Sequence, residues 1–334
     1  MKALVMGCGS IGVRHIFHLK QLGLTQVEAT DPNPQAGERA KASCQVVVYS
    51  NPEEALAKRP DVVLVCTPAA THIPMTIKAL EAGAHVFVEK PLSISLDGVD
   101  SLMEKARLDG RVVQVGYNLR YHPAMRLAKE ILESGRLGKI LTGHAEFGLY
   151  LKKWWPDRDY RKSYMVESRL SGGLLLDASH EIDLLIWFMG PIKEVVSCGD
   201  KLSDLDMKGL DVIKVLMRME SRALASLHID CLQPTYTRGF TLVGEDSALR
   251  WDCADGRADK SLGRLWAYDS AKGRYEEIPI HGNSGETYLE ELRDFLDSVT
   301  AGRPPQVGLK HGVEVLRVIA AIQKAIQNSS AVPV

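Results

Sequence analysis

The sequence has little that would tie the chain to a membrane, a nucleic acid or an oxidising compartment. No apolar run approaches the ~20 residues needed to span a bilayer, and the opening MKALVMGCGS has no apolar signal-peptide core. The formal net charge is −1, without the Lys/Arg clusters typical of phosphate-backbone contacts. The six cysteines include no C-x-x-C pair. We therefore expect a cytoplasmic protein with reduced thiols and neither nucleic-acid nor membrane partners.

The length and the hydrophobic pattern predict two domains of different architecture. A chain of 334 residues exceeds one ordinary core. Strands alternate with helices of about a dozen residues as far as residue 120, and strands separated by turn signals then follow one another. We predict an α/β fold, with a doubly wound parallel sheet of the Rossmann type at 1–120. The segment 121–334 is predicted to be an α+β substrate domain with a largely antiparallel open sheet.

The predicted antiparallel sheet also bears on assembly. Helices usually cover one face of such a sheet, and the other face meets solvent or a second subunit. We expect a homodimer or homotetramer formed through this sheet.

The first strand ends in a glycine pattern that predicts a dinucleotide site. KALVM is followed by GCGSIG, which opens a helix. Gly7 would permit the tight turn, and Gly9 the close approach of the pyrophosphate. Gly12 would let the helix pack on the strand, with Ser10 and Ile11 completing the loop.

An acidic residue predicts which dinucleotide binds. Asp31 ends the second strand about 20 residues after the last glycine, where it would accept hydrogen bonds from the ribose hydroxyls. A 2′-phosphate would meet this carboxylate, and residues 32–36 offer no Arg or Lys. NAD is favoured over NADP, and residues 1–120 are predicted to form an NAD-binding Rossmann domain.

Six motifs are spread over nearly the whole chain: GCGSIGVRH (7–15), TPAATH (67–72), EAGAHVFVEKP (81–91), GYNLRYHP (116–123), GGLLLDASHEID (172–183) and ETYLEELRDFL (286–296). Together they resemble the motifs of the glucose–fructose oxidoreductase / inositol dehydrogenase / rhizopine catabolism (Gfo/Idh/MocA) family. The stretch RDYRKSY is similar to that of members encoded among surface-polysaccharide and sugar-nucleotide genes. The resemblance implies an NAD-dependent oxidoreductase that moves a hydride between the cofactor and a secondary hydroxyl or ketone. The substrate would be a sugar, polyol or sugar nucleotide.

The resemblance also implies the catalytic residues. Lys90 would be the catalytic lysine beside the nicotinamide, often preceding a cis bond to Pro91, and its ammonium would favour the alkoxide. Asp177 and His180 would complete the site. The family usually has four residues from this Asp to the His, whereas DASH has three, so the transfer to Asp177 is less direct.

Helical spacing divides the charged residues around His180 into two groups. On one continuous helix, Asp177, His180 and Glu181 would form a stripe, with His180 as general base and either carboxylate as its partner. Asp183 lies off the stripe and is expected to pair within the second domain. The stripe could ligate zinc, but no second His or Cys cluster lies at ligand spacing, so no metal is predicted.

Further candidates flank these motifs. Four residues after the fourth and fifth strands are expected on the cofactor side: Thr67, Pro68, His72 and Glu89. Six residues with planar or aromatic groups are expected on the substrate side: Asn118, Arg120, Tyr121, Tyr160, Arg161 and Tyr164.

Two alternatives remain at this point. One is an enzyme that uses NAD to cleave a glycosidic bond without net redox, and the other is a non-catalytic regulator that senses a sugar or dinucleotide. The presence of both Lys90 and His180 favours an enzyme, since a sensor needs neither.

Overall fold

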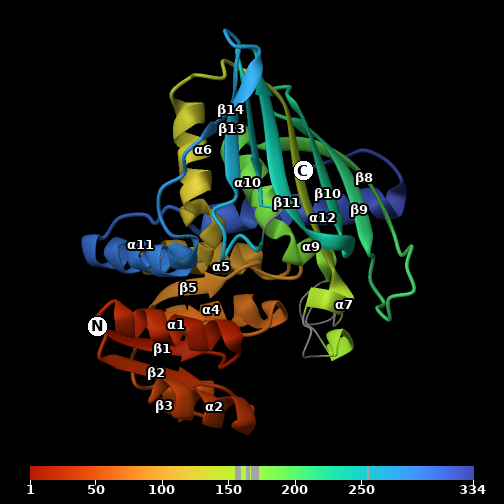
Figure 1. Cartoon of the computed structure of the whole chain (residues 1–334). Coiled ribbons are helices and arrows are strands. Elements are labelled where there is room, and N and C mark those ends of the chain that lie inside the picture. Colours follow the sequence, from red (N-terminus) through yellow and green to blue (C-terminus); the bar gives the residue numbers. More distant parts are fainter. Residues whose placement is uncertain (155–158, 163–165, 167–172, 254–255) are drawn as a thin grey trace. The chain divides into compact units, whose positions relative to one another are not determined.

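The computed structural model describes residues 1–154, 159–162, 166, 173–253 and 256–334, which form two compact units (Figure 1). Unit 1 contains Met1–Asn118 and Tyr288–Leu316, and unit 2 contains Leu119–Thr287 and Arg317–Val334. The break after Asn118 is close to the expected domain boundary. No sequence signal indicated that residues 288–316 belong with unit 1. Within the described residues, no helix has both the length and the hydrophobicity needed to cross a bilayer.

Unit 1 is built on a six-stranded sheet in the order β3-β2-β1-β4-β5-β6. The prediction of a parallel sheet is confirmed. The central strands of this sheet are Val- and Leu-rich and are buried apart from Lys2 at the start of β1, which is typical of strands covered on both faces. The elements are β1 (Lys2–Met6), α1 (Ser10–Gln21), β2 (Gln26–Thr30), α2 (Pro34–Cys44), β3 (Val47–Tyr49), α3 (Pro52–Leu56), β4 (Val62–Val65), η1 (Ala69–Thr71), α4 (His72–Glu81), β5 (His85–Glu89), α5 (Val99–Asp109), β6 (Val113–Gly116) and α11 (Thr287–Ala301). Helix α12 (Leu309–Asn328) is divided between the units after Leu316.

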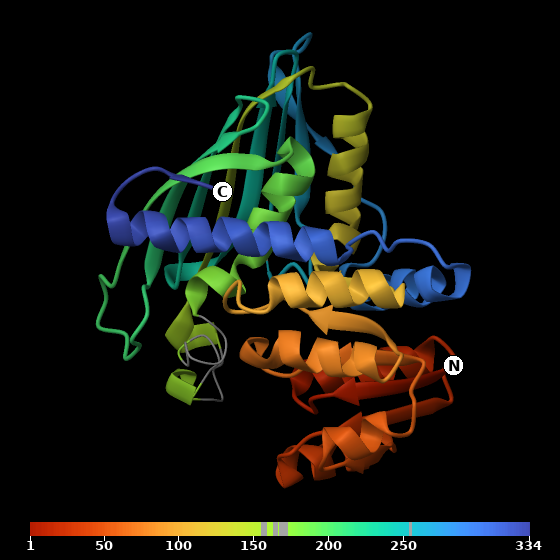
Figure 2. The same ribbon diagram turned by 180° about the vertical axis from the view of Figure 1, so that it is seen from behind.

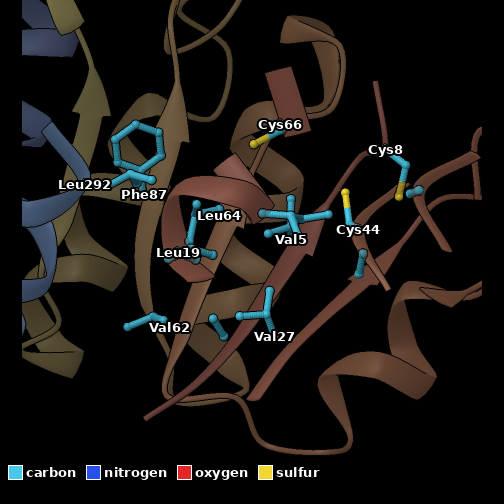
Figure 3. Close-up of a cluster of buried hydrophobic side chains, with 14 of the residues drawn as sticks. Val5, Cys8, Leu19, Val27, Cys44, Val62, Leu64, Cys66, Phe87 and Leu292 are labelled. Carbon is cyan, nitrogen blue, oxygen red and sulfur yellow. The ribbon is translucent and has the colours of Figure 1, made fainter. Parts of the chain in front are cut away.

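The core of unit 1 explains why the distant helix α11 belongs to it. Figure 3 shows Leu292 of α11 beside Phe87 of β5, in one cluster with aliphatic side chains of β1, β2 and β4. Phe295 of the same helix meets the Phe87 ring edge-on at 5.9 Å between centroids. Each such buried apolar side chain contributes roughly 1.5–3 kcal/mol. The apolar stripe of α11 therefore completes the core of the N-terminal sheet.

Unit 2 contains a nine-stranded sheet in the order β14-β13-β12-β11-β7-β10-β9-β8-β15, and its strand pairs are antiparallel except β7 with β10. The prediction of a largely antiparallel sheet is confirmed. The elements are η2 (Asn118–Tyr121, whose first residue is in unit 1), α6 (Pro123–Glu133), β7 (Ile140–Tyr150), α7 (Leu151–Trp154), η3 (Tyr160–Lys162), α9 (Leu174–Asp177), α10 (Ser179–Met189), β8 (Ile192–Asp200), β9 (Val212–Met219), β10 (Leu224–Asp230), β11 (Leu232–Gly244), β12 (Ala248–Asp252), β13 (Arg264–Asp269), β14 (Arg274–Ile278), η4 (Ser284–Glu286) and β15 (Val332–Pro333).

Helices cover one face of this sheet. Figure 2 shows α6 (yellow) and α10 (green) lying against the same side of the strands. Strand β9 accordingly alternates between buried Val215 and Met217 and exposed Leu216 and Arg218. On the exposed side Leu216 pairs with Val196 of β8, and these side chains are 64% and 45% exposed. The sheet therefore has an apolar region on the face opposite the helices.

Candidate functional site

The glycine loop after β1 leaves one open position. Gly7 has φ +98°, and a Cβ there would lie 2.6 Å from the Cys66 carbonyl oxygen. A Cβ on Gly12 would lie 1.9 Å from the Gly7 carbonyl oxygen, whereas one on Gly9 would meet nothing within 4 Å. Gly7 and Gly12 are thus required by the protein's own packing. Gly9 faces free space where a ligand can approach the backbone.

The start of α1 is suited to an anion. Gly9 is the N-cap of α1 and supplies no side-chain cap, and the helix begins at Ser10 with Ile11 half-buried. Amide groups at a helix N-terminus favour phosphate through their hydrogen-bonding capacity and the helix dipole. This loop therefore fits a dinucleotide pyrophosphate.

Asp31 is held beside this loop. Its Oδ2 accepts a hydrogen bond from the Cys8 amide at 2.7 Å, and its Oδ1 accepts one from the Asn33 amide at 2.8 Å. The carboxylate is only half-buried, so it can also accept ribose hydroxyls. The glycine loop at the start of α1 and the Asp31 carboxylate together fit NAD.

His72 ties together two turns at the carboxyl edge of the sheet. Its Nδ1 lies 2.8 Å from the Pro91 carbonyl oxygen and its Nε2 lies 2.7 Å from that of Thr67. The ring is fully buried, and this burial lowers the pKa of His72. His72 therefore positions the two turns, and its place beside the cofactor stays a prediction. Thr67 is half-buried and Pro68 exposed, so these two can contact a cofactor.

Lys90 follows β5 at the same edge, and the bond to Pro91 is cis. The Lys90 side chain is half-buried. Its main-chain N–H donates to Glu89 Oε2 at 3.2 Å, and the other oxygen of Glu89 lies 2.6 Å from His15 Nε2. Glu89 thus fixes the backbone at Lys90.

In unit 2, the predicted polar stripe is interrupted. Helix α9 ends at Asp177, Ala178 forms a turn, and α10 begins at Ser179. The prediction of one helix through Asp177 and His180 is therefore wrong, because the helical spacing of 100° per residue does not extend across the turn. His180 and Glu181 share the first turn of α10, and both are buried.

Glu181 is neutralised by an arginine that the sequence analysis missed. Its Oε1 accepts a hydrogen bond from Arg238 Nε of β11 at 2.6 Å. Burial opposes the positive charge, but Glu181 and then Tyr236 raise the pKa of Arg238 above its ordinary value. Arg238 lies two residues after Tyr236 on β11. The alternating pattern of a strand does not show whether such an arginine faces solvent or a buried partner.

Asp183 is also paired within unit 2, as predicted. Arg120 donates to its two oxygens at 2.6, 2.9 and 3.1 Å, and the two side chains are 3% and 0% exposed. Arg120 thus holds a buried carboxylate of the same unit, and its contact with substrate stays a prediction. Asn118 and Tyr121 are likewise buried.

Two of the remaining substrate candidates form local contacts. The Tyr160 hydroxyl accepts from the Asp206 amide at 3.0 Å, and Arg161 makes a two-pronged pair with Asp159 at the surface. Tyr164 lies outside the described residues.

An aromatic group is formed by Trp154 of α7 and Tyr236 of β11. The ring of Trp154 stacks on Tyr236 at 5.6 Å, and the Arg257 guanidinium lies 4.4 Å from the Trp154 ring. The Tyr236 hydroxyl accepts a hydrogen bond from Arg238 at 3.2 Å, so this aromatic group adjoins the Arg238–Glu181 pair.

Comparison with known families decides the assignment. Residues 1–117 match the Gfo/Idh/MocA oxidoreductase family, NAD-binding Rossmann fold, and residues 129–334 match its C-terminal alpha/beta domain. The chain belongs to the Gfo/Idh/MocA family. This Gfo/Idh/MocA protein is an NAD-dependent oxidoreductase, and unit 1 carries its NAD-binding fold.

Relatives match over nearly the full length. The myo-inositol 2-dehydrogenase of Thermotoga maritima is 28% identical, covering 99% of this chain and 98% of its own. The scyllo-inositol 2-dehydrogenase (NAD(+)) of Bacillus subtilis is 30% identical, with 92% and 88% covered. A levoglucosan dehydrogenase solved with NADH has a TM-score of 0.87 at 20% identity, with 100% and 99% covered, and confirms the fold of this family member.

Proposed function

We propose that the protein is an NAD-dependent dehydrogenase of secondary hydroxyl groups on polyols or sugars, working in either direction. The near-full-length similarity to two inositol 2-dehydrogenases supports this substrate class. The observation that carries the proposal is the Lys90 site: a half-buried lysine at the carboxyl edge of the NAD-binding sheet, with its backbone fixed by Glu89. NAD, when bound, accepts the hydride.

Lys90 is proposed to stabilise the substrate oxygen. As a hydroxyl is oxidised, negative charge develops on its oxygen, and an ammonium that donates a hydrogen bond lowers the energy of that charge. The anchoring of its main chain by Glu89 limits the positions its ammonium can reach. Such restriction is required because a displacement of about 1 Å can cost ~10²-fold in rate.

His180 is proposed to take the hydroxyl proton. It stands in the first turn of α10, and the adjacent Glu181 is already neutralised by Arg238. Asp177 is therefore the carboxylate we propose to act with His180. Imidazole side chains are common proton relays in enzymes.

Replacement of Lys90 tests this function. NADH formation is measured by absorbance with myo-inositol, scyllo-inositol, aldoses and UDP-sugars as substrates. Lys90→Ala is expected to lose roughly 10²–10⁴-fold in kcat, the usual contribution of a positioned proton-transfer group. The affinity for NADH, measured by fluorescence, should change little because the glycine loop and Asp31 are intact. Lys58→Ala, at an exposed lysine of unit 1, is the matched control.

The outcomes separate the alternatives. Near-normal turnover in Lys90→Ala would remove this residue from the mechanism. Cleavage of a glycoside without accumulation of NADH would favour the redox-neutral glycosidase, and tight NADH binding without turnover of any substrate would favour a sensor.

We also propose that two copies of the chain associate through the exposed face of the unit 2 sheet. Leu216 and Val196 are paired there across β9 and β8, and Leu224 at the start of β10 is 52% exposed. Large apolar side chains grouped on an exposed sheet face are typical of protein interfaces.

A further inference from the structure

Three titratable side chains come together inside unit 1, next to the segment that carries Lys90. They are His15 of α1, Glu89 of β5 and Glu291 of α11, which are 0%, 8% and 0% exposed. One nitrogen or oxygen atom from each lies within 4.8 Å of the others. The NAD-binding role of unit 1 does not account for Glu291.

The contacts indicate which group carries the negative charge. His15 Nε2 lies 2.6 Å from Glu89 Oε1, and His15 Nδ1 is buried without a hydrogen-bond partner among the described residues. The ring lies edge-on to Phe87 at 5.1 Å. A charged imidazole would leave an N–H at Nδ1 buried and unsatisfied, whereas a neutral ring donates its Nε2 hydrogen to a Glu89 carboxylate. Glu89 is therefore the anion.

Glu291 has no such support. Neither of its carboxyl oxygens has a hydrogen-bond partner among the residues that the structure describes. Burial, and then the charge on Glu89, raise the pKa of Glu291 well above its usual value, with Arg14 acting in the opposite direction. Two carboxylates this close in a buried place do not both ionise.

A metal ion is a poorer explanation of the three residues. Ligand atoms that bind one metal at about 2.0–2.2 Å in tetrahedral geometry stand roughly 3.3 Å apart. The 2.6 Å between His15 and Glu89 is a hydrogen-bond length. The distance therefore indicates a hydrogen between these two residues.

Glu89 transmits the state of this cluster to the backbone at Lys90. Its Oε2 accepts from the Lys90 N–H, and a Cβ on the neighbouring Gly116 of β6 would lie 3.3 Å from the same oxygen. The carboxylate is thus confined on one side by β6 and on the other by His15. A second negative charge on Glu291 would repel it from this position.

We propose that Glu291 is a positioning residue that carries a proton at neutral pH, so that the Glu89 carboxylate can hold the main chain at Lys90. The proposal rests on the function assigned to Lys90 above. The substrate-side chemistry is unchanged, and Glu291 acts on it only through Glu89.

The other titratable groups around the cluster do not change charge near neutrality. Burial, then Glu89 and Glu291, raise the pKa of the Cys66 thiol, which stays protonated. Burial, then His15 and Arg14, lower the pKa of His18 to about 4, so it is neutral. Arg14, stacked at 4.4 Å on the Tyr288 ring, keeps its positive charge. A change at neutral to alkaline pH within this cluster is therefore assigned to Glu291.

The first test needs no substrate. Glu291→Gln mimics the protonated acid, and Glu290→Gln, at a half-exposed residue of the same helix paired with Arg293, is the control. The infrared C=O band of a protonated carboxyl is expected at pH 7 in the wild type and the control, and is expected to be absent in Glu291→Gln. Absence of this band from the wild type would overturn the proposal.

Thermal unfolding gives the matching thermodynamic result. Because the folded-state pKa of Glu291 is raised, its stabilising effect is complete below the unfolded pKa and is lost as pH rises through the folded value. The Tm of Glu291→Gln minus that of the wild type should therefore increase between pH 5 and pH 9. A Tm difference between Glu291→Gln and the wild type that does not change with pH would contradict the proposal. A fall in the wild-type Tm on dialysis against EDTA would also contradict it and would favour a bound metal.

The positioning role is tested with the substrate that gives turnover in the panel. The wild-type kcat should fall about tenfold or more at alkaline pH as Glu89 is displaced, since a shift of about 1 Å can cost ~10²-fold. Glu291→Gln should not show this fall in kcat at alkaline pH. At neutral pH, Glu291→Ala should have a lower kcat than the wild type, whereas Glu291→Gln should keep the wild-type value. Identical pH profiles for wild type and Glu291→Gln would remove the positioning role. If no substrate is turned over, the proposed function fails, while the infrared and unfolding results still decide the proton.

Discussion

Arg120→Met tests whether the arginine of GYNLRYHP is part of a structural ion pair or of a substrate site. The Arg120–Asp183 contact is two-pronged, with its shortest distance at 2.6 Å, and is almost completely shielded from solvent. The Arg120 guanidinium also lies 5.3 Å from the centre of the Trp187 ring. Replacement of Arg120 alone removes the cation that donates three hydrogen bonds to the buried Asp183 carboxylate.

The expected loss follows from that burial. Breaking a buried pair by removing one partner costs about 3–5 kcal/mol, whereas replacing both partners by apolar groups of similar volume is often neutral. For a unit of about 200 residues, 1 kcal/mol corresponds to roughly 2–4 °C in Tm, so the single variant should lose about 6–20 °C. The double variant Arg120→Met/Asp183→Leu should recover most of this loss.

Urea unfolding followed by circular dichroism measures both variants and Asp183→Leu in one double-mutant cycle. We expect a coupling energy of about 2 kcal/mol or more between the two positions. Arg218→Met is the control, because the Arg218–Glu194 pair is half-exposed and such pairs contribute at most about 1 kcal/mol. Unchanged stability of Arg120→Met together with a raised KM would refute the reasoning and return Arg120 to the substrate site.

Two further predictions concern the glycine loop and the exposed sheet face. Gly9→Ala should fold with a Tm close to that of the wild type but bind NADH at least tenfold more weakly, because the added methyl group occupies only space that a ligand would fill. Gly12→Ala should fail to fold stably, because its methyl group would meet the Gly7 carbonyl oxygen. Normal NADH affinity in Gly9→Ala would exclude this loop from the cofactor site. Leu216→Lys should lower the molar mass measured by light scattering to that of one chain, since it places a charge beside Val196; an unchanged mass would place the subunit contact elsewhere.

The strands and helices of unit 1 could be predicted from the sequence because the patterns that indicate them are short and recur along the chain. Each unit 1 strand is a short apolar run next to a helix with its own start and stop signals, so errors at one element do not spread to the next. The return of α11 to unit 1 could not be read in this way. Its apolar stripe indicates that it is covered, but Phe295 meets Phe87 only through packing across more than half of the chain.

The break at Ala178 marks a different limit. The run from Leu174 to Met189 is helical in composition, and a helix pattern alone favours continuity. The turn depends on backbone hydrogen bonds, with the Glu181 amide donating to the Ala178 carbonyl at 3.2 Å. Side-chain periodicity does not report such a bond, so the predicted stripe included Asp177.

The four ionisable residues of GGLLLDASHEIDLLIWFMG show why the sequence pattern alone does not identify the partner of a buried charge. Glu181 is neutralised by Arg238 and Asp183 by Arg120, two arginines that lie 57 and 63 residues away in sequence. The sequence indicates that buried charges here need partners, but it does not indicate which arginines supply them. Both pairs hold Glu181 and Asp183 in structural contacts, and our proposal for proton transfer therefore concerns His180 and Asp177. The same reasoning from charge balance places a proton on Glu291, where a carboxyl is buried without a cation of its own.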